Sequence, residues 1–135
     1  MMKNEIFTVS LAKNPVISLK VEPGHFTTSH FHAAHYLDLN NLKTNAFLAK
    51  EVAIELALPY MSTTLVDTIV CMEGTEVIGA YMASELLQEG TYSINMGRDI
   101  NIVTPISNAN KNLMIQSNKQ DLINNQNIIV LVSTV

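Results

Sequence analysis

The stretch from Leu65 to Met72 constrains the fold most, because it is almost continuously apolar and rich in β-branched residues. Such a run is typical of a strand that is covered on both faces, as in a parallel sheet. It ends abruptly at Glu73-Gly74-Thr75-Glu76. Apolar residues then recur at helical spacing up to Leu87, and Gly90 is placed to end that helix. The pattern predicts a buried strand, a tight loop and a helix.

A second helix is predicted before this strand. The segment 45–58 is rich in alanine and carries a broad apolar face, Thr44 or Asn45 is suited to cap it, and Pro59 is expected to stop it. Helix, buried strand, loop and helix together make a βαβ-type layout. The expected fold class is therefore α/β with a mostly parallel sheet.

The rest of the chain predicts shorter elements. Strands are expected at Tyr36–Leu39, Ser93–Met96, Ile100–Val103, Leu113–Gln116 and Ile128–Val132. The third and fourth of these are expected to pair as a hairpin with a long polar tip. Residues 121–127 indicate a short helical turn and loop, and residues 1–23 predict one or two short peripheral elements.

Composition excludes several classes of protein. A chain of 135 residues with 47% hydrophobic and 15% charged residues can build the core of one domain. Its net charge of −4, without clustered Lys and Arg, argues against nucleic acid as a partner. Its single cysteine, Cys71, cannot form an internal disulfide, and neither a signal peptide nor an apolar stretch of roughly 20 residues is present. We therefore expect a reduced cytoplasmic protein that is not anchored in a membrane.

The loop Glu73-Gly74-Thr75-Glu76 is a candidate anion site. It joins the carboxyl end of a buried strand to the start of a helix, where amide groups lack partners and the helix dipole is positive. The backbone N–H groups of Gly74 and Thr75 are placed to cradle a phosphate or pyrophosphate. Ordinary capping is the alternative, in which Thr75 caps the helix and Glu73 and Glu76 sit favourably against its dipole. Spacing alone leaves both interpretations open.

This context resembles a known family. Residues 66–83 resemble the pyrophosphate-loop strand, turn and helix of the type I phosphoribosyltransferases. Gly24–Ser29, Tyr36-Leu37-Asp38 and the helix from Asn45 are similar to the amino-terminal part of the orotate phosphoribosyltransferases, and residues 127–135 resemble the strand that leads into the family's phosphoribosyl-diphosphate signature. The resemblance, which covers about Gly24 to Val135, implies a three-layer α/β sandwich. It also implies a single domain over residues 1–135, incomplete at the carboxyl end, with a small hood over residues 1–40.

The resemblance implies an activity as well. Members of this family are glycosyltransferases of nucleotide metabolism, and the orotate enzymes serve pyrimidine biosynthesis. They transfer ribose 5-phosphate from phosphoribosyl diphosphate (PRPP) to a nucleobase such as orotate, while Mg²⁺ holds the leaving pyrophosphate. By this resemblance the protein is a homodimer, residues Glu73–Glu76 bind pyrophosphate, and Arg98 helps to neutralise it. The positions that contact the ribose are Ser133 and Thr134.

Three departures from the family pattern favour a second hypothesis. Ser133 and Thr134 stand where members carry an acidic pair, and neutral hydroxyls cannot replace carboxylates as charged acceptors. The loop that binds the 5′-phosphate would follow Val135. Thr104–Gln116, in which only Lys111 is basic, replaces a lysine-rich loop. The alternative is a non-catalytic nucleotide- or phosphate-binding regulatory protein of the same fold. Arg98 has its own alternative interpretation, as a solvated turn pair with Asp99.

Four histidines support a third hypothesis, a small metalloprotein. His25, His30, His32 and His35 lie close together in the sequence. On a strand His30 and His32 would share one face, where Asp38 adds an oxygen ligand. The alternatives are a polar surface turn and, in the phosphoribosyltransferase interpretation, one histidine at the base-binding pocket. Cys71 is expected to be a small buried side chain and not a nucleophile.

Overall fold

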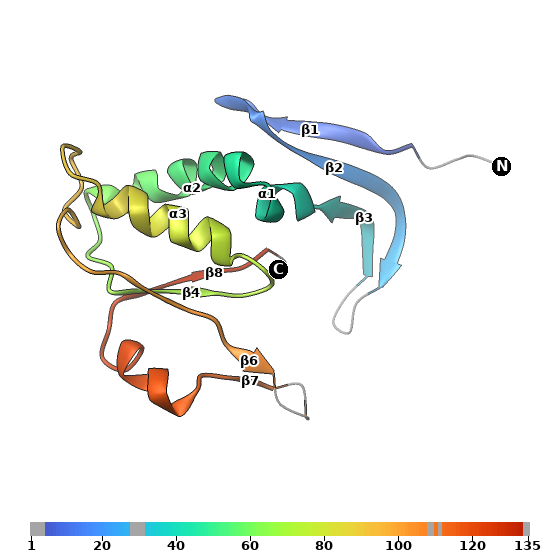
Figure 1. Ribbon diagram of the computed structural model, residues 1–135. Helices are drawn as coiled ribbons and strands as arrows, with labels where there is room; N and C mark the ends of the chain where they lie inside the picture. Colours follow the sequence, from blue (N-terminus) through green and yellow to red (C-terminus); the bar gives the residue numbers. More distant parts are fainter. Residues whose placement is uncertain (1–4, 28–31, 108–109, 111, 134–135) are drawn as a thin grey trace.

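The computed structural model describes residues 5–27, 32–107, 110 and 112–133. Along the chain the elements are β1 (Phe7–Leu11), β2 (Asn14–Thr27), β3 (His32–Asp38), α1 (Asn40–Thr44), α2 (Ala46–Met61), β4 (Thr68–Cys71), α3 (Glu76–Leu87), β5 (Asn101–Val103), β6 (Ile106–Ser107), β7 (Leu113–Met114), the 3-10 helix η1 (Ser117–Leu122) and β8 (Ile128–Leu131). Helices α2 and α3 lie between an antiparallel sheet of β1, β2 and β3 and a parallel sheet of β5, β4 and β8 (Figure 1).

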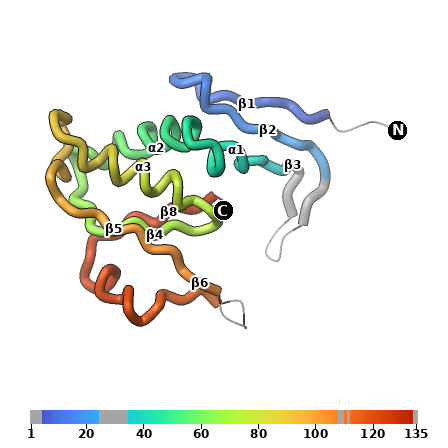
Figure 2. The backbone as a smooth tube through the Cα atoms, viewed as in Figure 1, coloured from blue at the N-terminus to red at the C-terminus, as the bar shows by residue number. Residues whose placement is uncertain are grey.

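The predicted buried strand is confirmed as the central strand of the parallel sheet. All four residues of β4 are buried, and β4 pairs in parallel with β5 on one side and with β8 on the other. The mixed helices and strands and this parallel sheet confirm the expected α/β character. The segment from β6 through η1 lies on the side of the sheet away from the helices (Figure 2), where the Thr68 hydroxyl donates to the carbonyl oxygen of Leu122.

The core forms where α2 and α3 pack on β4. Ala49, Ala53 and Ala57 recur every four residues along α2 and are fully buried. They belong to one apolar cluster with residues of β4 and α3, among them Ile69 and Met82. The alanine-rich composition of this helix therefore serves close packing as well as helix propensity.

Both predicted helices are present, with shifted ends. The Asn45 side chain caps α2 by accepting a hydrogen bond of 3.0 Å from the N–H of Leu48. The expectation that Pro59 stops the helix is wrong, since α2 continues to Met61. Proline removes one backbone donor, but Tyr60 and Met61 pack against the core cluster and hold the last turn. Helix α3 ends at Leu87, before Gly90.

The strand expected at Ser93–Met96 is wrong, because this segment forms turns. The Ser93 hydroxyl donates to the carbonyl oxygen of Leu86, and the fully buried Asn95 side chain bonds to backbone groups before β4. These side-chain bonds to backbone groups elsewhere in the chain hold the segment in turns.

The expected hairpin of 100–103 with 113–116 is also wrong. Strand β5 joins the parallel sheet beside β4, so β7 pairs with β6 instead. The helical turn expected at 121–127 begins earlier, as η1, and the strand expected at 128–132 is β8.

The amino-terminal part is more regular than expected. Strands β1, β2 and β3 form an antiparallel sheet, and β3 begins before the predicted Tyr36 and ends at Asp38. Two contacts link the β1–β2 turn to α2. Lys13 Nζ lies 2.8 Å from Glu55 Oε2, and Asn14 Nδ2 donates to Glu51 Oε2 over 2.9 Å. This sheet lies in the segment where the resemblance predicts a small hood, and we call it the hood sheet. None of the described helices is long and apolar enough to cross a membrane.

The contact between α3 and β4 gives a test of the packing. A Cβ atom added at Gly79 would overlap Cys71 Sγ and lie 3.4 Å from Leu131 Cδ1. We expect Gly79→Ala to lower the free energy of unfolding by about 1–3 kcal/mol, measured by urea denaturation. At an exposed helical site, glycine to alanine instead stabilises by about 1 kcal/mol. The matched control is Ser84→Ala on the exposed side of α3, which should leave stability nearly unchanged. Equal curves for Gly79→Ala and the control would contradict this packing.

Candidate functional site

The loop after β4 is a strained turn at the carboxyl edge of the parallel sheet. Glu73 and Gly74 both adopt left-handed backbone conformations, with φ of 59° and 79°. Glycine tolerates this conformation, whereas it costs a residue with a side chain roughly 1–2 kcal/mol. The N–H of Thr75 closes the turn on the carbonyl oxygen of Met72 at 3.3 Å, and α3 begins at Glu76. Strain at Glu73 persists because other groups hold that residue in place.

Thr75 ties the loop to the sheet. Its side chain is buried, and its hydroxyl donates to the carbonyl oxygens of Met72 over 2.8 Å and of Leu131 over 3.5 Å. Thr75 occupies the N-cap position of α3 but makes no side-chain capping bond, so capping by its side chain is wrong. Glu76 does lie in the first turn of α3, against the positive end of the dipole. By their position, the Glu76 and Val77 amides at the start of α3 lack intrahelical partners.

Ser133, which follows the end of β8, contacts this loop. Its N–H donates to Glu73 Oε2 over 3.2 Å, and its hydroxyl donates to the same oxygen over 3.0 Å. The structure thus brings together two predicted site segments, the loop and the first of the two ribose positions. The second ribose position, Thr134, lies outside the described residues.

Lys43 completes the site and is a residue that sequence reasoning missed. It reaches over from α1, and its Nζ donates to the carbonyl oxygen of Glu73 at 3.0 Å and to Ser133 Oγ at 3.4 Å. A Cβ atom on Gly74 would lie 3.9 Å from the same nitrogen. One signal was available in the sequence, because Lys43 is the only charged residue between Asp38 and Lys50.

A pocket of about 320 Å³ adjoins this edge of the sheet. It is lined by Cys71, Met72, Glu73, Thr104, Pro105 and Leu113. The volume is at the lower end of the range for small-ligand pockets, and ligands of open α/β sheets collect beyond the carboxyl ends of strands. The arrangement presents backbone amides and one ammonium group to a ligand that carries a phosphate.

The charges of this site decide what else an anion would need. The carboxylates of Glu73 and Glu76 outnumber the single ammonium group of Lys43, so these residues supply no excess positive charge. Mg²⁺ is commonly bound by one or two carboxylates together with substrate phosphates. The Glu73 carboxylate is an oxygen donor of the kind that Mg²⁺ prefers, so the donor set fits a magnesium–phosphate ligand. This carboxylate would hold the ion, which would supply charge neutralisation.

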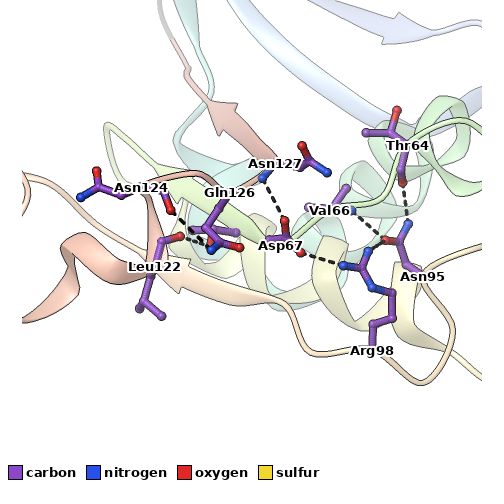
Figure 3. A network of polar contacts seen from close by, with 10 residues as sticks. Thr64, Val66, Asp67, Asn95, Arg98, Leu122, Asn124, Gln126 and Asn127 are labelled. Carbon is purple, nitrogen blue, oxygen red and sulfur yellow. Dashed lines mark hydrogen bonds and ion pairs between the residues drawn. The ribbon is translucent and has the colours of Figure 1, made fainter.

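Arg98 lies at the other end of the sheet. Its Nη2 is 2.7 Å from Oδ1 of Asp67, which precedes β4, and its Nη1 donates to Asn95 Oδ1 over 3.1 Å (Figure 3). The structure does not bring Arg98 together with the Glu73 loop, and it pairs Arg98 with the distant Asp67. Both side chains are half-buried.

The Arg98 contacts belong to a network that joins the segments entering the sheet. Asn95 Oδ1 also accepts from the N–H of Val66, and Asn95 Nδ2 donates to the carbonyl oxygen of Thr64, both over 2.8 Å. Asp67 Oδ2 accepts from the N–H of Asn127 over 2.9 Å, just before β8 (Figure 3). The observed role of Arg98 is therefore structural.

A larger pocket of about 700 Å³ adjoins this network. It is lined by residues 63–66, Ile94 and residues 126–129. It lies at the amino ends of β4 and β8, opposite the edge where α/β sheets hold their ligands. We therefore place the candidate site at the smaller pocket.

The histidine hypothesis falls largely outside the described part of the chain. His30 is not described, and of His25 and His32 only the strand positions in β2 and β3 are known. The described His35 ring meets the Phe7 ring edge-on, with 6.5 Å between centroids. Asp38 Oδ1 accepts from the N–H of Asn40 at the start of α1. Among the described residues, no three His, Cys, Asp or Glu side chains form a group that could hold a metal ion.

Cys71 is a core residue, as predicted. Its side chain is fully buried in β4, and burial raises the pKa of the thiol from 9.0 to about 11. The thiolate is the nucleophilic form of cysteine. A thiol with this pKa remains protonated at neutral pH.

Comparisons with protein-family models, with curated proteins and with solved structures found no match to this chain.

The network at the amino edge predicts a structural role for Asn95. Asn95→Ala removes the partners of the Val66 N–H and the Thr64 carbonyl oxygen in a buried position. We expect it to lower the free energy of unfolding by about 2 kcal/mol, measured by urea denaturation. Exposed Asn124→Ala is the control and should change little. An unaffected Asn95→Ala variant would show that water replaces these bonds.

The buried thiol predicts a pH dependence of stability. Because the Cys71 pKa is higher in the folded chain than in the unfolded chain, the folded state retains the proton as pH rises from 9.0 to about 11. Cys71 should therefore lower stability over this interval, by roughly 2 kcal/mol at its upper end. The measurement is the difference in unfolding free energy between the wild type and Cys71→Ala at each pH, which removes the contribution of other groups. A difference independent of pH would contradict the raised pKa.

Proposed function

We propose that this protein is a phosphoribosyltransferase-like protein of nucleotide metabolism that binds PRPP with Mg²⁺ at the carboxyl edge of its parallel sheet. The observation that carries the proposal is the convergence of Lys43, from α1, and Ser133, from the segment after β8, on Glu73 in the loop before α3. Two of these residues were expected at the ligand site by the family resemblance. The third supplies a cation beside the predicted pyrophosphate loop.

The proposed ligand suits the chemistry of this edge. Pyrophosphate carries several negative charges, which the Lys43 ammonium and the amides at the start of α3 can partly balance. Mg²⁺ held beside the Glu73 carboxylate would balance a further part of this charge. We propose that the bound donor transfers its ribosyl phosphate to a nucleobase such as orotate.

The second candidate is a non-catalytic phosphate- or nucleotide-binding protein of the same fold, and one observation favours it. Ser133, which stands in place of the first acidic residue of the family pair, donates to Glu73 through its N–H and hydroxyl. A hydroxyl that is engaged in this way is a weak substitute for a charged acceptor of ribose hydroxyls. The two candidates share the ligand and differ in turnover.

The location, the oligomeric state and the full architecture of the protein are proposed on the same resemblance. We place the protein in the cytoplasm, as a homodimer with a three-layer α/β sandwich. The two parallel neighbours of β4 support such an architecture, as do α2 and α3 on one face of the sheet and η1 on the other (Figure 2). The single buried cysteine suits a reducing compartment.

Titration calorimetry tests the proposed ligand. PRPP and inorganic pyrophosphate should each bind in the presence of Mg²⁺, and more weakly when the metal is chelated. Lys43→Ala should raise the Kd at least tenfold, because it removes the ammonium group beside the loop. Lys50→Ala, at an exposed position on α2, is the control and should bind as the wild type.

Outcomes of this titration separate the candidates. Absence of binding by the folded wild type would exclude both. Binding together with release of pyrophosphate when orotate is added supports the transferase. Binding of PRPP without release of pyrophosphate when any nucleobase is added supports the regulatory protein.

A further inference from the structure

Strand β1 is an open edge of the hood sheet. Among the described residues it pairs only with β2, and all five of its residues, Phe7 to Leu11, are exposed. The strand sequence FTVSL contains no charged residue and no proline. Natural proteins usually protect such an edge with charges, proline or a covering segment. The other outer strand of this sheet, β3, carries Asp38.

The side chains of β1 divide into an apolar and a polar face. Phe7 and Val9 lie opposite Val21 and Leu19 of β2, whereas Thr8 and Ser10 lie opposite Lys20 and Ser18. Cross-strand partners project on the same face of a sheet, so the first pairs make the apolar face. The side chains of Phe7, Val9 and Leu11 remain 45%, 47% and 37% exposed.

We propose that β1 pairs in antiparallel fashion with β1 of a second copy of this chain, about a two-fold axis through Val9. In this register Phe7 lies opposite Leu11 of the second copy, and Val9 lies opposite its own counterpart. On the polar face, Thr8 lies opposite Ser10. Apolar groups thus meet apolar groups, hydroxyls meet hydroxyls, and the edge backbone groups gain hydrogen-bond partners.

The length of the strand supports the same register. Strand β1 ends at Leu11, and Lys13 lies in the β1–β2 turn, so the ladder consists of the five residues Phe7 to Leu11. An axis through Val9 pairs all five of these residues in each copy, which gives the most cross-strand pairs that β1 can make with itself.

Neighbouring registers fit less well. An axis through Ser10 would pair only Val9 to Leu11 of each copy, and an axis through Thr8 would pair only Phe7 to Val9. The Val9 register alone among these three pairs the whole strand. A two-fold pairing also uses the β1 edge in both copies, so the assembly closes as a dimer.

The experiment uses charge at the axis. In Val9→Lys and in Val9→Glu, like charges oppose each other at position 9, so each variant alone should dimerise at least tenfold more weakly than the wild type in sedimentation-equilibrium measurements. Mixing the two variants should restore association, because only in this register does position 9 face itself. Val16→Lys, which replaces a similarly exposed valine of β2, is the control and should dimerise normally.

Three results would overturn the proposal: a wild-type chain that stays monomeric, a dimer that both Val9 variants retain, and variants that do not associate when mixed although each is folded by circular dichroism. A second measurement does not depend on association strength. Under oxidation, Val9→Cys should form a disulfide between copies, whereas Val16→Cys should not. These outcomes are independent of PRPP binding, so failure here leaves the proposed function untouched.

Discussion

The burial of β4 between two parallel neighbours is the constraint on which the rest of the structure depends. Its four residues are buried, and its backbone is paired on both sides. Helices α2 and α3 must then pack closely above it, which the alanines of α2 and Gly79 of α3 permit. Any larger side chain at these positions would separate the helices from the sheet.

A buried strand concentrates polar chemistry at its two ends, and the two ends of β4 differ. At the amino end, Asp67, Asn95 and Arg98 bond to one another and to backbone groups, so their polar atoms serve the fold. At the carboxyl end, Glu73 and Gly74 take left-handed conformations that Lys43 and Ser133 hold from outside the loop. Helix dipole, strained loop and convergent polar groups favour the carboxyl end as the ligand site.

Sequence reasoning succeeded where local pattern and burial agree. The apolar run 65–72 and the helical spacing after it correctly predicted β4, the loop and α3. In these segments the order of apolar residues itself shows which side chains are buried. It failed at Ser93–Met96, where a buried Asn95 imposes turns, and at Pro59, where packing holds the helix beyond the proline. These outcomes depend on partners that are distant in the sequence.

For the candidate site, the sequence by itself determined the loop, its glycine and the polar residues after β8, because strand ends and turns leave a local signature. Only the tertiary structure decided which charged residues belong there. It brought Lys43 to the loop from thirty residues away and placed Arg98 at the opposite edge. The physical reason is that side chains of single charged residues carry no periodic signal, so their partners are set by how the helices and strands pack.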